Sequence, residues 1–191
     1  TAGTGVGVAQ TADNRLKLNI PNDISSSAFF MVGALLIKNS KITLKKVGVN
    51  PLRTGLVTTL QEMGANISFK NIEEINGEKV ADIEVEYSKL KAINVPANRS
   101  ASMIDEYPIL AIACAFADGT SVLNGLEELK AKESNRLLMI AQNLEKCGVE
   151  VKINDNSLEI KGGVTMPKNR VKISTAMDHR IAMTFLIMGL C

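Results

Sequence analysis

The sequence predicts an α+β fold assembled from a repeated β-α-β-α-β-β unit, and three observations lead to this class. Three aspartates, Asp23, Asp105 and Asp178, each follow an extended run and precede a strongly apolar, small-residue helix. Downstream of the first two, strand and helix patterns recur in the same order. Each predicted helix follows a strand, with sheet on one side, so we expect two-layer packing around a shared core.

The first unit begins with the extended run "LKLNIP" and continues with the helix of "NDISSSAFFMVGALL", which Asp23 is suited to cap. A turn and a strand follow in "NSKITLKKV" (39–47). Residues 56–69 combine an amphipathic helix, a stop at Gly64 and a β-rich strand. The strand "ADIEVEY" (81–87) closes the unit, and the polar residues 68–78 before it indicate an irregular domain junction.

The second unit repeats this plan with "LKAINVP", the helix of "IDEYPILAIACAFA" and the strand of "DGTSVLNGL" (118–126). Residues 137–153 again read as helix, glycine stop at Gly148 and strand, and "SLEIKG" (157–162) adds a last strand. A third unit begins with "RVKIS" and the helix of "MDHRIAMTFLIMGL". The opening "TAGTGVGVAQTADNR" has no clear pattern, so we expect a poorly anchored terminus there.

The composition restricts the class of protein. Of the 191 residues, 46% are hydrophobic but only 4% are aromatic, without Trp, so the core is expected to be aliphatic and rich in Met. A net charge of +2 argues against a nucleic-acid-binding surface. The best apolar run, residues 181–191, is too short to span a membrane.

The three cysteines have no metal-ligand spacing. Cys114 and Cys147 lie in apolar, helix-like contexts, so we expect reduced thiols in the core. No signal-peptide pattern is seen, which makes a cytoplasmic location the expectation. The sequence opens at Thr1 and stops at Cys191 in mid-pattern, which indicates a piece of a longer protein.

The segment "KAKESNR" is out of pattern because it puts Lys132, Glu133 and Arg136 within one turn of a predicted helix. Taken alone it reads as a solvated surface, with Ser134 or Asn135 as N-cap and an acid–base pair worth about 0.2–0.5 kcal/mol. The matching turn of the first unit, "GVNPLRTGL", has one cation and no acid. Loops at the ends of a sheet are where sites usually lie. In the second unit, the corresponding corner between loop and helix contains four charged residues, Lys130, Lys132, Glu133 and Arg136, which we call the loaded corner.

A second charged corner holds Arg180 at the start of the third predicted apolar helix. An arginine in the first helical turn opposes the helix macrodipole and costs roughly a few tenths of a kcal/mol. Helix N-termini bind anions, and a guanidinium grips a carboxylate or phosphate bidentately. From the residues alone we expect an anionic small-molecule site with Arg136 and Arg180, to which Asp105 and Glu133 add acid–base capacity. Helix capping remains the alternative for Asp105 and Asp178.

Four stretches resemble the enolpyruvyl transferases: "DISSSAFF", "NPLRTGLVTTLQEMGA", "SMIDEYPILAIACAFADGTSVLNGLEELKAKESNRL" and "DHRIAMTFLIMGL". Residues 102–137 resemble the branch of that family whose acceptor is shikimate 3-phosphate. The resemblance implies a two-domain parent, each domain built from three β-α-β-α-β-β units about a pseudo-threefold axis, with the site in the cleft between them. Residues 1–69 would be the last unit of one domain, and residues 70–191 most of the second, cut before its end.

The resemblance also implies an activity. The family branch is a transferase of the shikimate pathway, in aromatic amino-acid biosynthesis. It moves the enolpyruvyl group of phosphoenolpyruvate to the 5-hydroxyl of shikimate 3-phosphate and releases phosphate. We therefore expect these two small-molecule substrates, no metal or organic cofactor, no nucleic acid or membrane partner, and a monomeric cytoplasmic parent.

Site residues follow from the resemblance position by position. Asp105 resembles the carboxylate at the reacting hydroxyl of shikimate 3-phosphate, and Glu133 the proton donor and acceptor beside the methylene. These two are the expected catalytic residues. Lys132 and Ser26 resemble the lysine and serine that bind shikimate 3-phosphate, the serine at its phosphate. The pair that would hold the phosphoenolpyruvate carboxylate is Arg136 and Arg180.

Three positions depart from the family pattern. Asn135 replaces an aspartate beside Arg136, which we expect to loosen the orientation of that arginine. Asn22 stands where glycine is usual and is expected to restrict the turn, and Phe29 stands where some members have tyrosine. Family elements that supply most of the phosphate clamp are missing from this stretch. We therefore expect negligible turnover by this chain alone.

Three other functions stay open. The sister enzyme that acts on UDP-N-acetylglucosamine shares the fold and the donor. A non-catalytic fragment of the same fold is the second alternative. An RNA-end-processing enzyme of similar units would need a nucleotide site and a catalytic histidine, for which His179, between Asp178 and Arg180, is a poor candidate.

Overall fold

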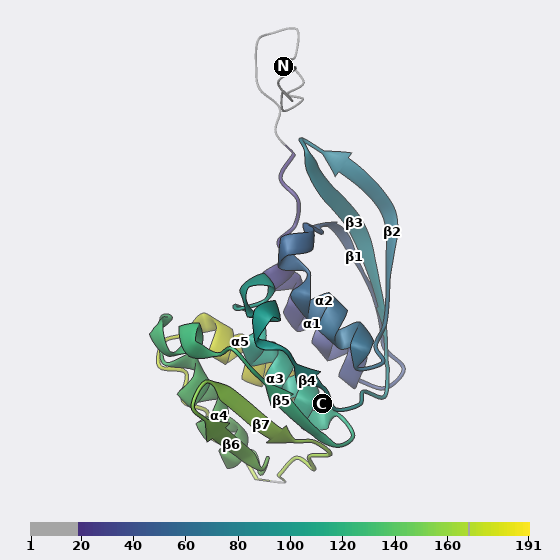
Figure 1. Cartoon of the computed structure of the whole chain (residues 1–191). Helices are drawn as coiled ribbons and strands as arrows, with labels where there is room; N and C mark the ends of the chain where they lie inside the picture. The colour runs from purple at the N-terminus through teal and green to yellow at the C-terminus, as the bar shows by residue number, and fades with distance from the viewer. Residues whose placement is uncertain (1–18, 168) are drawn as a thin grey trace, which may run out of the picture.

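A computed structural model describes residues 19–167 and 169–191 (Figure 1). The expected poorly anchored terminus and the start of "LKLNIP" lie outside these residues. The first unit comprises α1 (Ile24–Leu36), β1 (Lys41–Gly48), α2 (Gly55–Glu62), β2 (Asn66–Ile75) and β3 (Glu78–Glu86). Its three strands form an antiparallel sheet in the order β1-β3-β2. Asn22 adds a parallel bridge to Val47 at the free side of β1.

The second unit has the same topology. It comprises β4 (Asn94–Val95), α3 (Tyr107–Phe116), β5 (Thr120–Leu123), α4 (Arg136–Lys146), β6 (Val151–Asn154) and β7 (Ser157–Lys161). Its sheet runs β4-β5-β7-β6, with β4 parallel to β5 and the other pairs antiparallel. The predicted order β-α-β-α-β-β is therefore present in this unit, and Gly64 and Gly148 end α2 and α4 with φ of +94° and +82°.

Short 3₁₀ segments complete the loops before or after several helices. They are η1 (Pro51–Arg53), η2 (Ala97–Ser102) and η3 (Glu127–Ala131). The segments η1 and η3 occupy equivalent positions, between the second strand and the second helix of their units. The corner identified from the sequence therefore has a structural counterpart in the first unit.

The third unit contributes α5 (His179–Met188), but the strand expected at "RVKIS" does not form. Buried Asn143 of α4 binds this extended segment instead. Its Nδ2 donates to the Ser174 carbonyl at 2.8 Å, and its Oδ1 accepts from the Ser174 N–H at 3.0 Å. A helix side chain thus supplies the partners that a neighbouring strand would otherwise supply.

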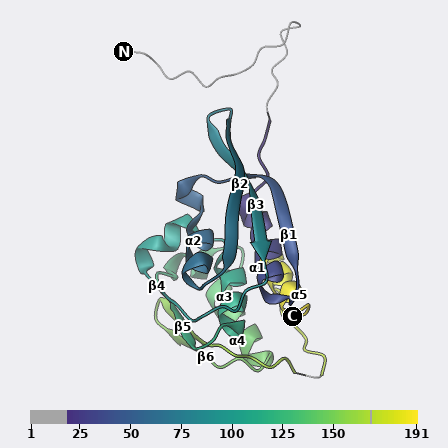
Figure 2. The same cartoon turned by 90° about the vertical axis from the view of Figure 1, so that its right-hand side faces the viewer.

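Each sheet is covered on one face by the helices of its own unit (Figures 1 and 2). The three helices α1, α3 and α5 pack against one another in pairs, as expected of units arranged about a threefold axis. The core is aliphatic, as predicted, and includes the free thiols Cys114 and Cys147. Burial raises the pKa of Cys114 to about 12. Within the described ranges, no helix is long and apolar enough to cross a membrane.

No irregular linker lies at residues 68–78, where the domain junction is expected. These residues form the β2–β3 hairpin, so a boundary between residues 69 and 70 would cut through β2. Buried side chains of both units also belong to one continuous core, because α1 packs directly on α3 and α5. Polar composition misled the prediction because both faces of this hairpin's outer end are exposed to solvent.

Candidate active site

Asp23 and Asp178 cap the helices that follow them. Asp23 accepts a hydrogen bond from the backbone of α1, and Asp178 accepts from the N–H groups of Arg180 (2.9 Å) and Ile181 (3.4 Å) at the start of α5. Each cap satisfies orphan donors of a first helical turn. The capping alternative is therefore correct for Asp178, although capping is not its whole role.

Asp105 does not serve as a helix cap. The helix α3 begins after Glu106, whose side chain makes no capping hydrogen bond, with a proline in its first turn. The Asp105 carboxylate instead faces cations from three positions. Arg136 Nη1 lies 3.0 Å from Oδ1, Lys132 Nζ 3.8 Å from Oδ1, and Arg180 Nη2 3.7 Å from Oδ2. Asp105 is therefore the residue at which the two charged corners meet.

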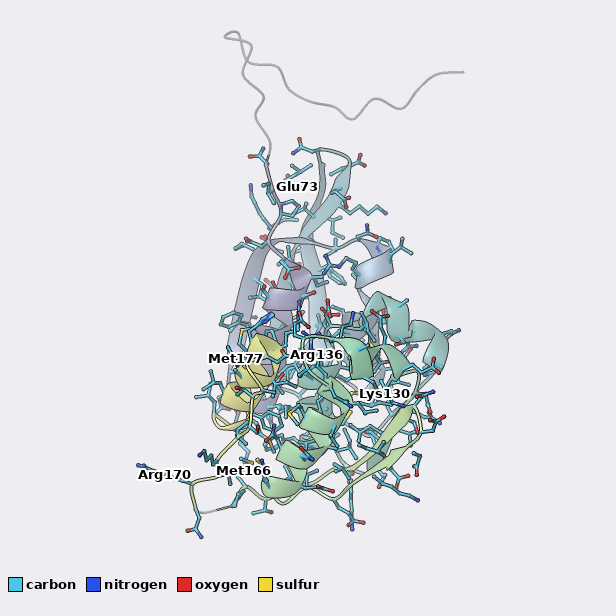
Figure 3. All side chains as sticks on the ribbon, turned by 90° about the vertical axis from the view of Figure 1, so that its left-hand side faces the viewer. Glu73, Lys130, Arg136, Met166, Arg170 and Met177 are labelled. Atoms are coloured by element: carbon cyan, nitrogen blue, oxygen red, sulfur yellow. The ribbon has the colours of Figure 1, made fainter. Side chains whose placement is uncertain are left out.

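Arg136 is the centre of this charged network and is fully buried (Figure 3). Its Nε donates to Asp178 Oδ2 at 2.8 Å, its Nη1 to Asp105 Oδ1 at 3.0 Å, and its Nη2 to Glu133. A buried guanidinium is costly unless it is paired and hydrogen-bonded. Arg136 meets this condition because carboxylates from three separate segments converge on it.

The surroundings of Arg136 and Asp178 favour the charged form of both side chains. Burial disfavours the charge of Arg136, but the hydrogen bond and charge of Asp178, with the charges of Glu133 and Asp105, raise its pKa above the ordinary value. Burial would raise the pKa of Asp178, yet hydrogen bonds from Arg136 and Ser134 (3.0 Å) outweigh it and lower that pKa. Both residues are therefore charged at neutral pH.

The two lysines of the loaded corner, Lys130 and Lys132, have partners in different parts of the fold. Lys132 pairs with Glu128 and faces Asp105, so it belongs to the network. Lys130 makes no hydrogen bond or ion pair with the residues of this network in the described part of the chain. Its Nζ donates to Asn156 Oδ1 at 2.7 Å, in the turn between β6 and β7. The sequence pattern grouped Lys130 with the site, and the fold separates it.

The departure at Asn135 has a local explanation. Its side chain caps α4 by accepting from the Leu138 N–H at 3.1 Å. Arg136 is held by three carboxylates and receives nothing from Asn135, so the expected loosening of the arginine is not seen. Asn22 does not adopt a positive φ, and its Nδ2 donates to the Lys45 carbonyl at 2.7 Å, so no glycine is required there.

Ser26 lies in a separate cluster at the start of α1. Its hydroxyl donates to Asp23 Oδ2 at 2.9 Å. Arg53 Nη2 completes this cluster by donating to Ser25 Oγ at 2.8 Å and reaching Asp23 Oδ1 at 3.5 Å. Within the described residues, no hydrogen bond or ion pair joins Ser26 to Arg136 or its partners.

Sequence reasoning missed the roles of Asp178 and Glu106. Asp178 anchors Arg136, and the available signal was the unusual Arg180 that follows it in the first turn. Glu106 is buried, and its Oε1 has no hydrogen-bond partner among the described residues. Burial raises the pKa of Glu106; the Ser25 hydroxyl and the charges of Arg180 and Arg53 oppose that rise only in part.

The arrangement can bind an anion and exchange a proton with it. Arg180, Lys132 and Arg136 supply positive charge where the helices α4 and α5 begin, and helix N-termini add their own partial positive charge. The partly exposed carboxylates of Asp105 and Glu133 lie beside these cations. The five residues predicted around the reacting groups form one cluster. Arg136 contacts Asp105 and Glu133. Asp105 also contacts Lys132 and Arg180.

Comparison with solved structures assigns these repeated β-α-β-α-β-β units to the enolpyruvyl transferase fold. The solved "enolpyruvyl transferase NikO from Streptomyces tendae" shares this fold, with a TM-score of 0.62 and 17% identity over 87% of this chain and 36% of that chain. The solved EPSP synthase from Acinetobacter baumannii matches with a TM-score of 0.87 and 35% identity, over 97% of this chain and 45% of that chain. The predicted fold class is confirmed.

The model of the EPSP synthase (3-phosphoshikimate 1-carboxyvinyltransferase) family matches residues 4–191, and the chain belongs to this family. The 3-phosphoshikimate 1-carboxyvinyltransferase of Paramagnetospirillum magneticum is 52% identical over 90% of this chain. That of a Pseudomonas species is 48% identical over 98% of the chain. The chain spans 38% and 41% of the length of these two relatives.

Proposed function

We propose that the protein to which this chain belongs transfers the enolpyruvyl group of phosphoenolpyruvate to the 5-hydroxyl of shikimate 3-phosphate, releasing phosphate. One observation carries the proposal. The partly exposed carboxylate of Asp105 faces Lys132, Arg136 and Arg180, which come from two separate corners of the fold. Both substrates are anions whose reaction needs a proton acceptor and a proton donor, and this cluster offers both beside its cations.

The roles of the residues follow from the chemistry. Asp105 takes up the proton of the attacking hydroxyl, and Glu133 handles the proton at the methylene carbon. General acid–base help of this kind contributes about 10²–10⁴ in rate. Lys132 binds shikimate 3-phosphate, while Arg136 and Arg180 hold the phosphoenolpyruvate carboxylate. Charge-assisted bonds of this type contribute about 1.5–3 kcal/mol each.

We further propose that a longer protein completes the site. The chain covers about two fifths of the relatives it matches, so a second domain would supply the rest of the phosphate clamp. The isolated chain is then expected to show negligible turnover. A monomeric cytoplasmic parent without a metal or organic cofactor remains our expectation.

We also propose that Ser26 binds the phosphate of shikimate 3-phosphate, for which its hydroxyl must leave Asp23, to which it now donates. In the full-length protein, S26A is expected to raise the KM for shikimate 3-phosphate by about tenfold. S40A, which removes an equally small hydroxyl bound to the Ala34 carbonyl, is the matched control. An unchanged KM in S26A would remove Ser26 from the site.

The deciding experiment is an assay of the full-length protein with phosphoenolpyruvate and each of two acceptors. We expect phosphate release with shikimate 3-phosphate and none with UDP-N-acetylglucosamine, and a fall of at least about 10²-fold in kcat for D105N. Turnover with UDP-N-acetylglucosamine would show that the protein catalyses the reaction of the sister enzyme instead. Release with neither acceptor would favour a non-catalytic protein of this fold.

A further inference from the structure

We propose that the Glu133 carboxylate is an internal substitute for the carboxylate of the anionic substrate, and that substrate binding at Arg136 exchanges one for the other. The identity of that substrate, phosphoenolpyruvate, rests on the proposed function. The exchange itself rests on how the three carboxylates around Arg136 differ in burial and in their other partners.

Arg136 is not free to turn toward an arriving ligand. Its side chain is 0% exposed, and its Nε is bound at 2.8 Å to Asp178, whose side chain is also 0% exposed. Asp178 is itself fixed by Ser134 and by the first turn of α5. The guanidinium plane is therefore set by the fold, and any ligand must approach one of its two outer nitrogens, Nη1 or Nη2.

Nη1 is occupied by a carboxylate that is difficult to displace. Asp105 Oδ1 lies 3.0 Å from it, and the same carboxylate is shared with Lys132 and Arg180. Moving Asp105 away would leave these cations without a common partner. Nη1 is therefore the less exchangeable of the two outer nitrogens.

Nη2 is occupied by the carboxylate that is easiest to displace. The side chain of Glu133 is 55% exposed, against 35% for Asp105 and 0% for Asp178. Glu133 lies in the irregular loop between η3 and α4, and its carboxylate makes no second ion pair within the described residues. A ligand carboxylate entering from solvent therefore meets Arg136 at Nη2 and replaces a group of the same chemistry.

The exchange links binding to catalysis. While Glu133 binds Arg136, its carboxylate is turned toward the guanidinium. When a substrate carboxylate takes this place, Glu133 is released beside the same substrate, where the proposed reaction needs a proton donor. The internal pair lowers the affinity for the substrate, because the pair must break when the substrate binds.

The test uses the full-length protein and compares E133A, E133Q and the charge control E127A. Glu127 is also an exposed acid and its loss changes the net charge equally, but its carboxylate accepts a hydrogen bond from Asn156, outside the network. Phosphoenolpyruvate and inorganic phosphate, which lacks a carboxylate, are titrated by calorimetry. We expect phosphoenolpyruvate to bind E133A about three- to tenfold more tightly than wild type, with E133Q between them. Phosphate binding is expected to change by less than about twofold, and kcat is expected to fall in both variants.

Two results would overturn the exchange. One is an E133A affinity for phosphoenolpyruvate equal to or weaker than wild type. The other is an equal gain for phosphate, or an equal gain in E127A, because either would be an effect of net charge alone. If wild type turns over but shows one of these results, the exchange fails and the proposed function survives. If wild type neither binds phosphoenolpyruvate nor turns over, the proposed function fails first.

Discussion

The two complete units of this chain share one topology but use an arginine at the second helix in different ways. In the first unit, Arg53 reaches Asp23 at 3.5 Å and Ser25 at 2.8 Å, with its side chain 57% exposed. In the second unit, Arg136 is fully buried and bonded to three carboxylates. The same corner therefore holds a surface pair in one unit and a buried ionic network in the other.

This difference shows that the repeated fold supplies equivalent positions, while the second unit places the buried charges of the candidate site at one of them. In both units a short 3₁₀ segment delivers the chain to the N-terminus of the second helix. Among the residues that the structure describes, a carboxylate of the next unit forms an ion pair with the arginine only at the second corner, where Asp178 binds Arg136. Burial then makes the network rigid, which a site needs to hold its groups in place.

The largest expected effect separates the two arginines. R136Q leaves Asp178 buried without its counter-charge, and breaking a buried pair costs about 3–5 kcal/mol of unfolding free energy. R53Q removes a solvated pair and is expected to cost about 0–1 kcal/mol. Urea unfolding of both variants measures the difference. Equal losses would mean that the two corners are energetically alike and that the comparison is wrong.

A smaller effect is expected at the aspartates that the two arginines contact. D178N is expected to cost about 2–3 kcal/mol, because it weakens charge-assisted hydrogen bonds from Arg136 and Ser134. D23N is expected to cost about 0.5 kcal/mol or less, since asparagine caps a helix as well as aspartate.

The pH dependence sharpens this second comparison. The pKa of Asp178 is lowered in the folded protein, so its contribution is complete above the unfolded value of about 3.9 and is lost as the pH falls through the folded value. The difference in unfolding free energy between wild type and D178N should therefore stay constant from pH 7 to about pH 4 and narrow as the pH falls further toward pH 3. A difference that stays constant down to pH 3 would contradict the assignment.

The smallest expected effect is a gain. Glu106 is buried between the two corners with its pKa raised, so its ionised form opposes folding. E106Q is expected to stabilise the fold by about 1 kcal/mol at neutral pH. Because the folded pKa is the higher one, wild-type stability falls as pH rises from the usual glutamate pKa through the folded value. The gain should therefore vanish in acid, and a loss of stability in E106Q at pH 7 would show that the ionised carboxylate is needed.

Much of the fold was predictable because its signals are local. Periodicity and glycine stops gave the order of helices and strands, and Gly64 and Gly148 end their helices as expected. The domain junction was not predictable from composition, because a long exposed hairpin and an interdomain linker are both polar. The strand expected at residues 170–174 does not form for a long-range reason. A strand needs a partner strand, and here the side chain of Asn143 binds the backbone of Ser174 instead.

The site was predictable in part. The loaded corner at Lys132, Glu133 and Arg136 was visible because the first unit lacks its charges. The sequence grouped Asp105 with both corners but did not predict its direct contacts, because Arg136 and Arg180 lie 31 and 75 positions away from it. Lys130 was included for its sequence proximity alone, and its side chain points to another turn.

The sequence by itself determined the repeated unit and most of the charged groups of the site, because helix and strand periods and residue chemistry are properties of short segments. Only the tertiary structure decided which charges are buried and which are paired. Asp178 caps its own helix by local geometry, yet it becomes the anchor of Arg136 only when α5 packs beside α4. Burial and long-range pairing depend on how distant segments pack together, and no short segment contains that information.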